Sequence, residues 1–106
     1  MISYEDFSRL EMKVGTVVDV KDHPDADKLY VLTVDIGSET RQVVAGMKEY
    51  YTPDEIKGKQ IVVIINLEPA MIRGVESQDM LLAAEKDGIA VLLGADKKIG
   101  NGAKVC

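Results

Sequence analysis

An alternating segment near the N-terminus constrains the fold of this chain more than any other feature. Between Met12 and Lys21 the residues Met12, Val14, Thr16, Val18 and Val20 share one face, and Lys13, Gly15, Val17, Asp19 and Lys21 share the other. A period of two is typical of a half-buried β-strand. Gly15 lies in the middle of this strand, where glycine usually marks a bulge or a sharp bend. The pattern predicts a strand that turns the corner of a β-barrel.

A β-hairpin is predicted directly after this strand. Residues 28–36 alternate again, with Tyr30, Leu32, Val34 and Ile36 on one face, and Gly37–Ser38 follows as a turn signal. Residues 40–45 form the returning strand, so the second and third strands are expected to pair in an antiparallel hairpin.

Two short helices are predicted, one before the first strand and one between the third and fourth strands. Ser3 is placed to cap an opening helix, on which Phe7 and Leu10 form one apolar stripe. The second helix has Thr52 as its N-cap and Pro53 at its first position, and Gly58 ends it.

The remaining segments complete the predicted order of elements. Residues 60–67 are mostly β-branched and apolar, which predicts a strand covered on both faces. Residues 68–79 are expected to form a long irregular loop, and further strands are predicted at 80–85, 89–93 and 103–106. This order, with glycine in the first strand, is that of an all-β OB-fold, a five-stranded Greek-key barrel with short helices.

A single domain is expected over residues 1–106, because a chain of this length suffices for one core. About 25 residues, roughly 86–106, exceed the minimal barrel.

The composition excludes several classes of protein. There are 13 Lys and Arg against 18 Asp and Glu, a formal charge of −5, which argues against non-specific coating of nucleic acid. The apolar content of 46% excludes a disordered chain, and even the longest apolar runs, such as Ile61 to Ile65, are too short to cross a membrane. The first residues have no secretory pattern, so we expect a cytoplasmic protein without membrane association.

Catalytic and metal sites are not predicted. Cys106 and His23 are the only residues of their types, so neither a disulfide nor a Cys/His zinc site can form within the chain. The sequence has no phosphate-binding or dinucleotide-binding glycine motif, and His23 is expected to hydrogen-bond within its loop rather than act as a base. Asp22, Asp25 and Asp27 lack the spacing of a calcium loop and are expected to shape turns. We therefore expect a binding domain with no cofactor.

Two elaborate loops flank the face that binds ligands in an OB-fold, namely residues 23–30 and 66–79. Within and beside them stand His-Pro-Asp-Ala-Asp-Lys-Leu-Tyr (23–30), Val-Val-Ala-Gly (43–46), Asn-Leu-Glu-Pro (66–69) and Arg-Gly-Val-Glu-Ser-Gln-Asp-Met-Leu-Leu-Ala-Ala (73–84). At these motifs the chain resembles the tRNA-binding OB domain appended to methionyl-tRNA synthetases, which also occurs in free-standing tRNA-binding proteins. The resemblance is collinear over roughly residues 6–106.

The resemblance implies a module that binds tRNA by shape and backbone contacts and is not itself an enzyme. It implies a homodimer whose interface uses material beyond the barrel, which gives the C-terminal extension a role. Such a module acts in trans with the synthetase or as its accessory β-subunit. The alternative is an OB-fold dimer that binds peptides as a secretion-type chaperone. Met1 and the cap at Ser3 favour a complete chain over a fragment of a synthetase.

Six residues are predicted to bind nucleic acid. The resemblance implies Lys28, Asn66, Arg73 and Ser77. We add Arg41 and Lys48, because these charged residues lie on the predicted hairpin and just after it. Cations suit phosphate, and the amide and hydroxyl suit sugar or base edges. Asn66 can instead satisfy its own loop, Lys28 can pair with Asp25 or Asp27, and the parity of Tyr30 favours the barrel wall over base stacking.

The chain departs from the family pattern in the second loop. Members of this family commonly carry lysine where this chain has Glu68 and Met71, and glycine where it has Asp79. The acidic residues in 1–8 and 49–56 lie outside the predicted groove, so the net charge does not exclude tRNA as a ligand. We expect a modest, salt-sensitive binder.

Overall fold

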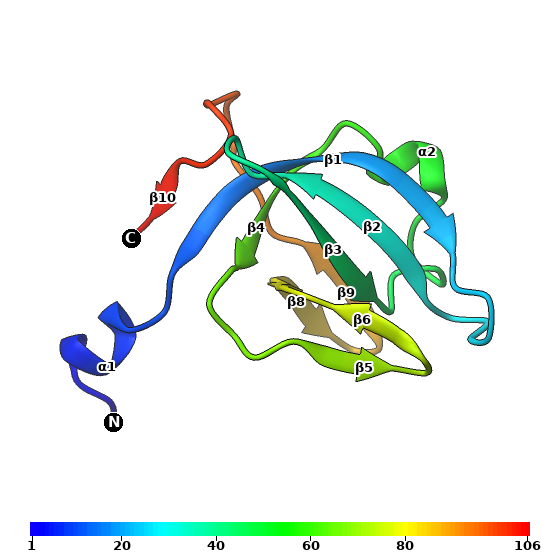
Figure 1. The fold of residues 1–106 in the computed structure, drawn as a ribbon, viewed down its shortest axis with the longest axis horizontal. Coiled ribbons are helices and arrows are strands. Elements are labelled where there is room, and N and C mark those ends of the chain that lie inside the picture. Colours follow the sequence, from blue (N-terminus) through cyan, green and yellow to red (C-terminus); the bar gives the residue numbers. More distant parts are fainter.

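The computed structural model describes residues 1–106 as an all-β barrel with two short helices (Figure 1). The elements are α1 (Tyr4–Ser8), β1 (Met12–Asp22), β2 (Tyr30–Asp35), β3 (Thr40–Ala45), α2 (Pro53–Ile56), β4 (Gln60–Ile64), β5 (Ala70–Ile72), β6 (Val75–Ser77), β7 (Met80–Leu81), β8 (Ala83–Lys86), β9 (Ile89–Leu92) and β10 (Lys104–Val105). The main sheet has the order β3-β2-β1-β4-β7, and β10 also pairs with β1. Neither helix is long and apolar enough to span a membrane.

The first strand turns the barrel corner as predicted, but its faces differ from the prediction. β1 pairs with β4 through Thr16 and with β2 from Thr16 onward, and its register with β2 shifts between Val17 and Asp19. Val17, on the face of Gly15 that was predicted to be polar, is fully buried, and Val18 at the bulge is 41% exposed. Beyond the bulge Val20 packs against the same cluster as Val17, so the parity changes there. Gly15 is required by close approach, since a Cβ there would lie 2.6 Å from Val34 Cγ1 and 2.9 Å from the Asp35 carbonyl oxygen.

The hairpin and the buried strand follow the prediction. β2 and β3 pair antiparallel from Tyr30–Ala45 to Asp35–Thr40. β4 is covered on both faces, because Ile61 and Val63 belong to the larger apolar cluster and Val62 and Ile64 to the smaller one. The two clusters stabilise the barrel from both sides of this strand.

The helix caps also agree with the sequence. The Ser3 hydroxyl accepts a hydrogen bond from the Asp6 N–H at 3.1 Å and begins α1. In α2, Thr52 and Glu55 form a capping box, in which the Glu55 carboxylate accepts from the Thr52 N–H at 2.8 Å. These hydrogen bonds hold the pKa of the Glu55 carboxyl below its usual value.

The irregular loop predicted at 68–79 is wrong: the segment contains the β5–β6 hairpin. Arg73 and Gly74 form its two-residue turn, with φ values of 53° and 89°. Positive φ at both positions is typical of a tight hairpin turn. The strands have only three residues each, too few to show alternation. The strand predicted at 80–85 is likewise divided into β7 and β8.

The C-terminal residues fold back onto the barrel. β8 and β9 form a hairpin, and the following segment crosses β4 and β1 before β10 (Figure 1). Gly94 lies so close to β4 that a Cβ would meet the Gln60 carbonyl oxygen. Further along, the Val14 N–H donates to the Ala103 carbonyl at 2.9 Å, and the Gly102 N–H donates to the Val14 carbonyl at 2.8 Å. These contacts join the extension to the first strand of the barrel.

Candidate nucleic-acid interface

Several side-chain hydrogen bonds and one backbone hydrogen bond, rather than a regular ladder, join β3 to residues 76–79, and we call this junction the seam. The Gln42 N–H donates to Gln78 Oε1 at 2.8 Å, and the Gln78 N–H donates to the Gln42 carbonyl at 2.8 Å. The Val44 N–H donates to the buried Ser77 hydroxyl at 3.0 Å, and that hydroxyl donates to the Asp79 carbonyl. The seam thus positions the β5–β6 hairpin against the barrel.

A buried ion pair lies at one end of the seam. Arg41 Nη1 lies 3.1 Å from Asp79 Oδ1, and Arg41 Nε lies 3.2 Å from the exposed Glu39 carboxylate. The Asp79 side chain has no exposed surface, and its Oδ2 has no hydrogen-bond partner. Burial raises the pKa of the Asp79 carboxyl, and the guanidinium of Arg41 opposes that rise.

His23 connects the loop between β1 and β2 to the same hairpin. Its Nδ1 accepts a hydrogen bond from the Asp25 N–H at 2.9 Å, and its Nε2 lies 2.9 Å from the Ile72 carbonyl oxygen. These two contacts place the ring proton on Nε2, which donates to Ile72. As predicted, His23 hydrogen-bonds within its loop, and in addition it links this loop to β5.

A small cavity lies between β3, β5 and residues 77–80. Its volume is about 200 Å³, and Val44, Leu67, Ala70, Ile72 and Met80 supply its apolar lining. Glu68 also lines this cavity. The cavity and the β5–β6 hairpin form the candidate groove for a ligand.

Three of the predicted cations already have acidic partners. Lys28 lies 3.1 Å from Glu49 rather than from Asp25 or Asp27, and Lys48 lies 3.1 Å from Asp22. Arg41 is held in the seam. A phosphate that binds any of these cations competes with a carboxylate.

Two other predicted residues are also engaged in internal hydrogen bonds. Asn66 Oδ1 accepts from the Glu11 N–H at 2.9 Å, and Asn66 Nδ2 donates to the Arg9 carbonyl at 2.7 Å, so this amide fixes the chain between α1 and β1. Ser77 is buried in the seam. Arg73 alone among the four predicted cations forms no ion pair within 4.0 Å, and its side chain is exposed.

Other side chains named in the sequence analysis lie outside the candidate groove. The Tyr30 hydroxyl donates to the Tyr51 carbonyl at 2.7 Å and lies in the barrel wall, as its parity predicts. No group of three His, Cys, Asp or Glu side chains is placed to hold a metal ion. The roles of Gln42, Gln78 and Asp79 were not predicted, because their partners lie 34 or more residues away in the sequence.

The sequence matches a family described as "Putative tRNA binding domain" over residues 12–104. Over 98% of its length the chain is 51% identical to methionine–tRNA ligase of Pyrococcus horikoshii, and over 99% it is 50% identical to that of Archaeoglobus fulgidus. It spans only 14% and 16% of those proteins.

Solved structures show the same fold over the whole chain. The MetRS-related protein from Pyrococcus horikoshii superposes with a TM-score of 0.94 at 34% identity, covering 100% of this chain and 98% of that one. The chaperone CsaA from Bacillus anthracis superposes with a TM-score of 0.90 at 30% identity, covering 100% and 99%. With the match to the family over nearly every residue, these similarities show that the chain belongs to the tRNA-binding OB-fold family and is homologous to a domain of methionyl-tRNA ligases.

Proposed function

We propose that this chain is a tRNA-binding module that recognises folded tRNA by shape and backbone contacts and has no catalytic role. It acts in trans with methionyl-tRNA synthetase or as its accessory β-subunit, in the cytoplasm. The observation that carries this proposal is the match to tRNA-binding domains over residues 12–104. The free-standing MetRS-related protein, which has nearly the same length, supports the action in trans.

Arg73 is the proposed leading contact at the groove. It lies in the turn of the β5–β6 hairpin, is exposed and has no acidic partner. Lys28 and Lys48 can join it by exchanging their exposed carboxylate partners for phosphate, since exposed ion pairs contribute only about 0–1 kcal/mol. Arg41, Asn66 and Ser77 act in this proposal by holding the groove in shape.

A homodimer is part of the proposal. The β8–β9 hairpin leaves Ile89 61% exposed and Val91 48% exposed, and Leu93 follows at 42%. These apolar side chains fit a second copy of the chain, which would cover them. Two modest sites on one particle then engage one tRNA with an increased effective concentration.

Titration of the purified protein with tRNA at low and moderate salt tests the proposal. Binding is expected at low salt, and its absence there would overturn the function. Arg73→Asn removes the charge and suits the positive φ, so we expect a loss of about 1–2 kcal/mol, or about 5- to 30-fold in affinity. Arg73→Lys is the matched control, because it keeps the charge and should retain most of the binding.

The second candidate function is peptide binding of the chaperone type. It is favoured by the similarity to CsaA and by the 68% exposed Met71 beside an apolar cavity. A reduced, carboxymethylated α-lactalbumin serves as the unfolded probe. Displacement of tRNA by this probe would favour the chaperone function, whereas tRNA binding without competition would favour the module proposed above.

A further inference from the structure

Three of the seven lysines that form no ion pair line two adjoining pockets away from the groove. These are Lys59, Lys97 and Lys98, none of which has a carboxylate within 4.0 Å. Lys97 and Lys98 line a polar pocket of about 580 Å³ that reaches β1, β4 and the C-terminal segment. Lys59 lines the adjoining pocket, which shares Gln60 and Asp96 with the first. We call this surface the lysine face.

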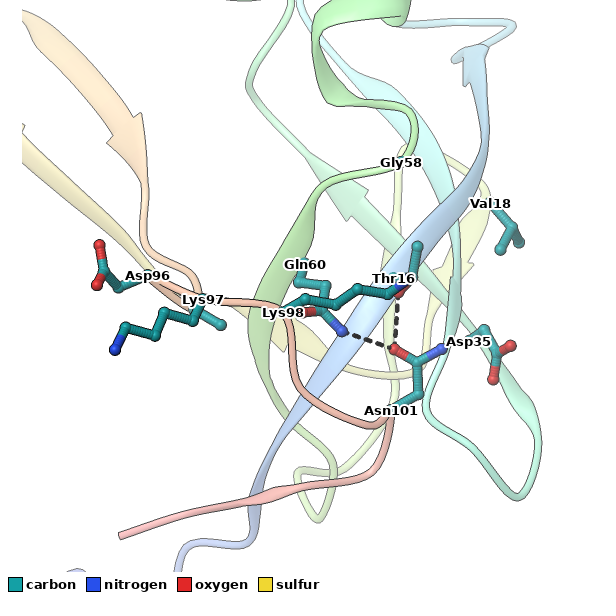
Figure 2. Close-up of a pocket in the computed structure, with 10 residues that line it drawn as sticks. Thr16, Val18, Asp35, Gly58, Gln60, Asp96, Lys97, Lys98 and Asn101 are labelled. Carbon is teal, nitrogen blue, oxygen red and sulfur yellow. Dashed lines mark hydrogen bonds between the residues drawn. The ribbon is translucent and has the colours of Figure 1, made fainter.

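Side-chain hydrogen bonds anchor the segment that carries these lysines. Asn101 Oδ1 accepts from the Thr16 hydroxyl at 2.7 Å and from Gln60 Nε2 at 3.3 Å (Figure 2). Gln60 also bonds both backbone groups of Ile99, accepting from its N–H at 3.0 Å and donating to its carbonyl. Lys97 and Lys98 therefore extend from a fixed backbone, which lowers the entropic cost of presenting them to a ligand.

Two acidic residues share the pocket with these lysines. Asp35 Oδ1 accepts from the Gly37 N–H at 2.8 Å, and Asp96 is exposed beside Lys97. In Figure 2 the Lys98 side chain runs toward Thr16, whereas Lys97 and Asp96 point away from it. Three lysines against two aspartates leave a local surplus of one positive charge on a chain whose net charge is −5.

The chemistry of the pocket fits phosphate rather than protein. Only Val18 and Ala95 among its lining residues are apolar. Interfaces between proteins usually have an apolar core and are depleted in lysine. Lysine ammonium groups around a polar pocket, with no aromatic side chain to stack a base, suit contacts to the backbone of a nucleic acid.

We propose that the lysine face is a second RNA-binding surface that contacts the phosphodiester backbone of the tRNA bound at the groove. This inference rests on the proposed function. The β5–β6 hairpin and the C-terminal segment lie on different sides of the barrel in Figure 1, within a domain whose longest dimension is 38 Å. One folded RNA with several arms contacts both surfaces, and the lysine face supplies the charge that the paired cations of the groove do not.

The test is the salt dependence of tRNA binding by the Lys97→Ala/Lys98→Ala double variant. If both lysines neutralise phosphates, the slope of log K against log salt becomes shallower by about 1.4–1.8. The ratio of the wild-type affinity to that of the double variant should then be roughly tenfold larger at 50 mM than at 200 mM salt. The Lys97→Arg/Lys98→Arg variant keeps both charges and should retain the wild-type slope.

Lys104→Ala is the matched control, because Lys104 is exposed, has no ion pair and lies on β10 outside the pocket. Its slope should equal that of the wild-type protein. Asp96→Asn should strengthen binding at low salt. An unchanged slope in the double variant, while Arg73→Asn still weakens binding, would overturn the lysine face and leave the proposed function standing. If the wild-type protein binds no tRNA at any salt, the proposed function fails and this inference fails with it.

Discussion

The groove and the lysine face carry similar numbers of cations. Most cations of the groove form ion pairs in the folded protein, whereas those of the lysine face form none. At the groove, Arg41 is only 21% exposed and faces two carboxylates, and Lys28 and Lys48 each have one acidic partner. On the lysine face, Lys97 and Lys98 have none. The number of basic residues near a site therefore does not measure the charge available to a ligand.

The same comparison separates stability from binding. Substitutions in the seam remove contacts that hold the barrel together, so their main effect should be on the free energy of unfolding. Substitutions on the lysine face remove charges that form no ion pair in the free protein. Their main effect should be on tRNA affinity and its dependence on salt.

The largest expected effect is that of Arg41→Met. Without the guanidinium, the fully buried Asp79 carboxylate has no partner, and the loss at pH 7 should be about 3 kcal/mol in the free energy of unfolding. Burial raises the pKa of Asp79 in the folded state, and the loss of Arg41 raises it further. The protonated folded state is then favoured, so the destabilisation should shrink as the pH falls through that raised pKa.

Urea unfolding at pH 7 and pH 4 measures this effect. The control is Glu39→Gln, which changes only the exposed partner of Arg41 and should cost less than about 0.5 kcal/mol. A loss that is the same at both pH values would contradict an electrostatic role for the buried pair.

Ser77→Ala should have the next largest effect. The Val44 N–H loses its acceptor in a buried position, which should cost about 1–3 kcal/mol. Ser38→Ala, in an exposed turn, is the control and should change stability by less than about 0.5 kcal/mol. If Ser77→Ala instead leaves unfolding unchanged and weakens tRNA binding, the hydroxyl contacts RNA and not the seam.

Much of this fold could be predicted from local patterns. Alternation predicted β2, the turn signal after it predicted the returning strand β3, and the run of β-branched residues predicted β4. The parity of β1 beyond Val17 could not be predicted, because the bulge between Val17 and Asp19 arises just after the strand changes partners. The seam could not be predicted either, since Gln42 and Gln78 are 36 residues apart in the sequence and meet only in the closed barrel.

The candidate site was harder to predict than the fold for a related reason. Sequence position placed Lys28 near the groove, and only the structure shows that Glu49 lies beside it. Asn66 has the residue type of a ligand contact, yet both ends of its amide bind the backbone around α1. A motif shows which segment of the chain corresponds to a segment of the family. Whether a side chain in it is free to contact a ligand depends on neighbours that are distant in the sequence.

A smaller effect is expected for Asn101→Ala beside the lysine face. The Thr16 hydroxyl and Gln60 each lose an acceptor, and the part-buried site should lose about 0.5–1.5 kcal/mol in the free energy of unfolding. Lys97 and Lys98 keep their charges, so tRNA affinity should fall while the salt slope stays nearly constant. A slope as shallow as that of the double lysine variant would contradict a purely positioning role for Asn101.

The smallest effect on stability, and the sharpest test of the comparison, is expected for Glu49→Gln. Lys28 and Glu49 are 77% and 51% exposed, so the loss of their ion pair should change the free energy of unfolding by less than about 0.5 kcal/mol. Lys28 then resembles the lysines of the lysine face in having no acidic partner. If Lys28 meets phosphate, tRNA binding should strengthen, because the competing carboxylate is gone.

Glu5→Gln is the matched control for this last prediction. It removes the same unit of negative charge from the exposed helix α1, which lies apart from the β5–β6 hairpin in Figure 1. Measured by tRNA titration at 50 mM salt, the two variants separate a local effect from a change in net charge. Stronger binding by Glu49→Gln alone means that Lys28 was masked by its partner. Equal gains by both variants mean that only the overall charge matters, and the groove then depends on Arg73 and on its shape.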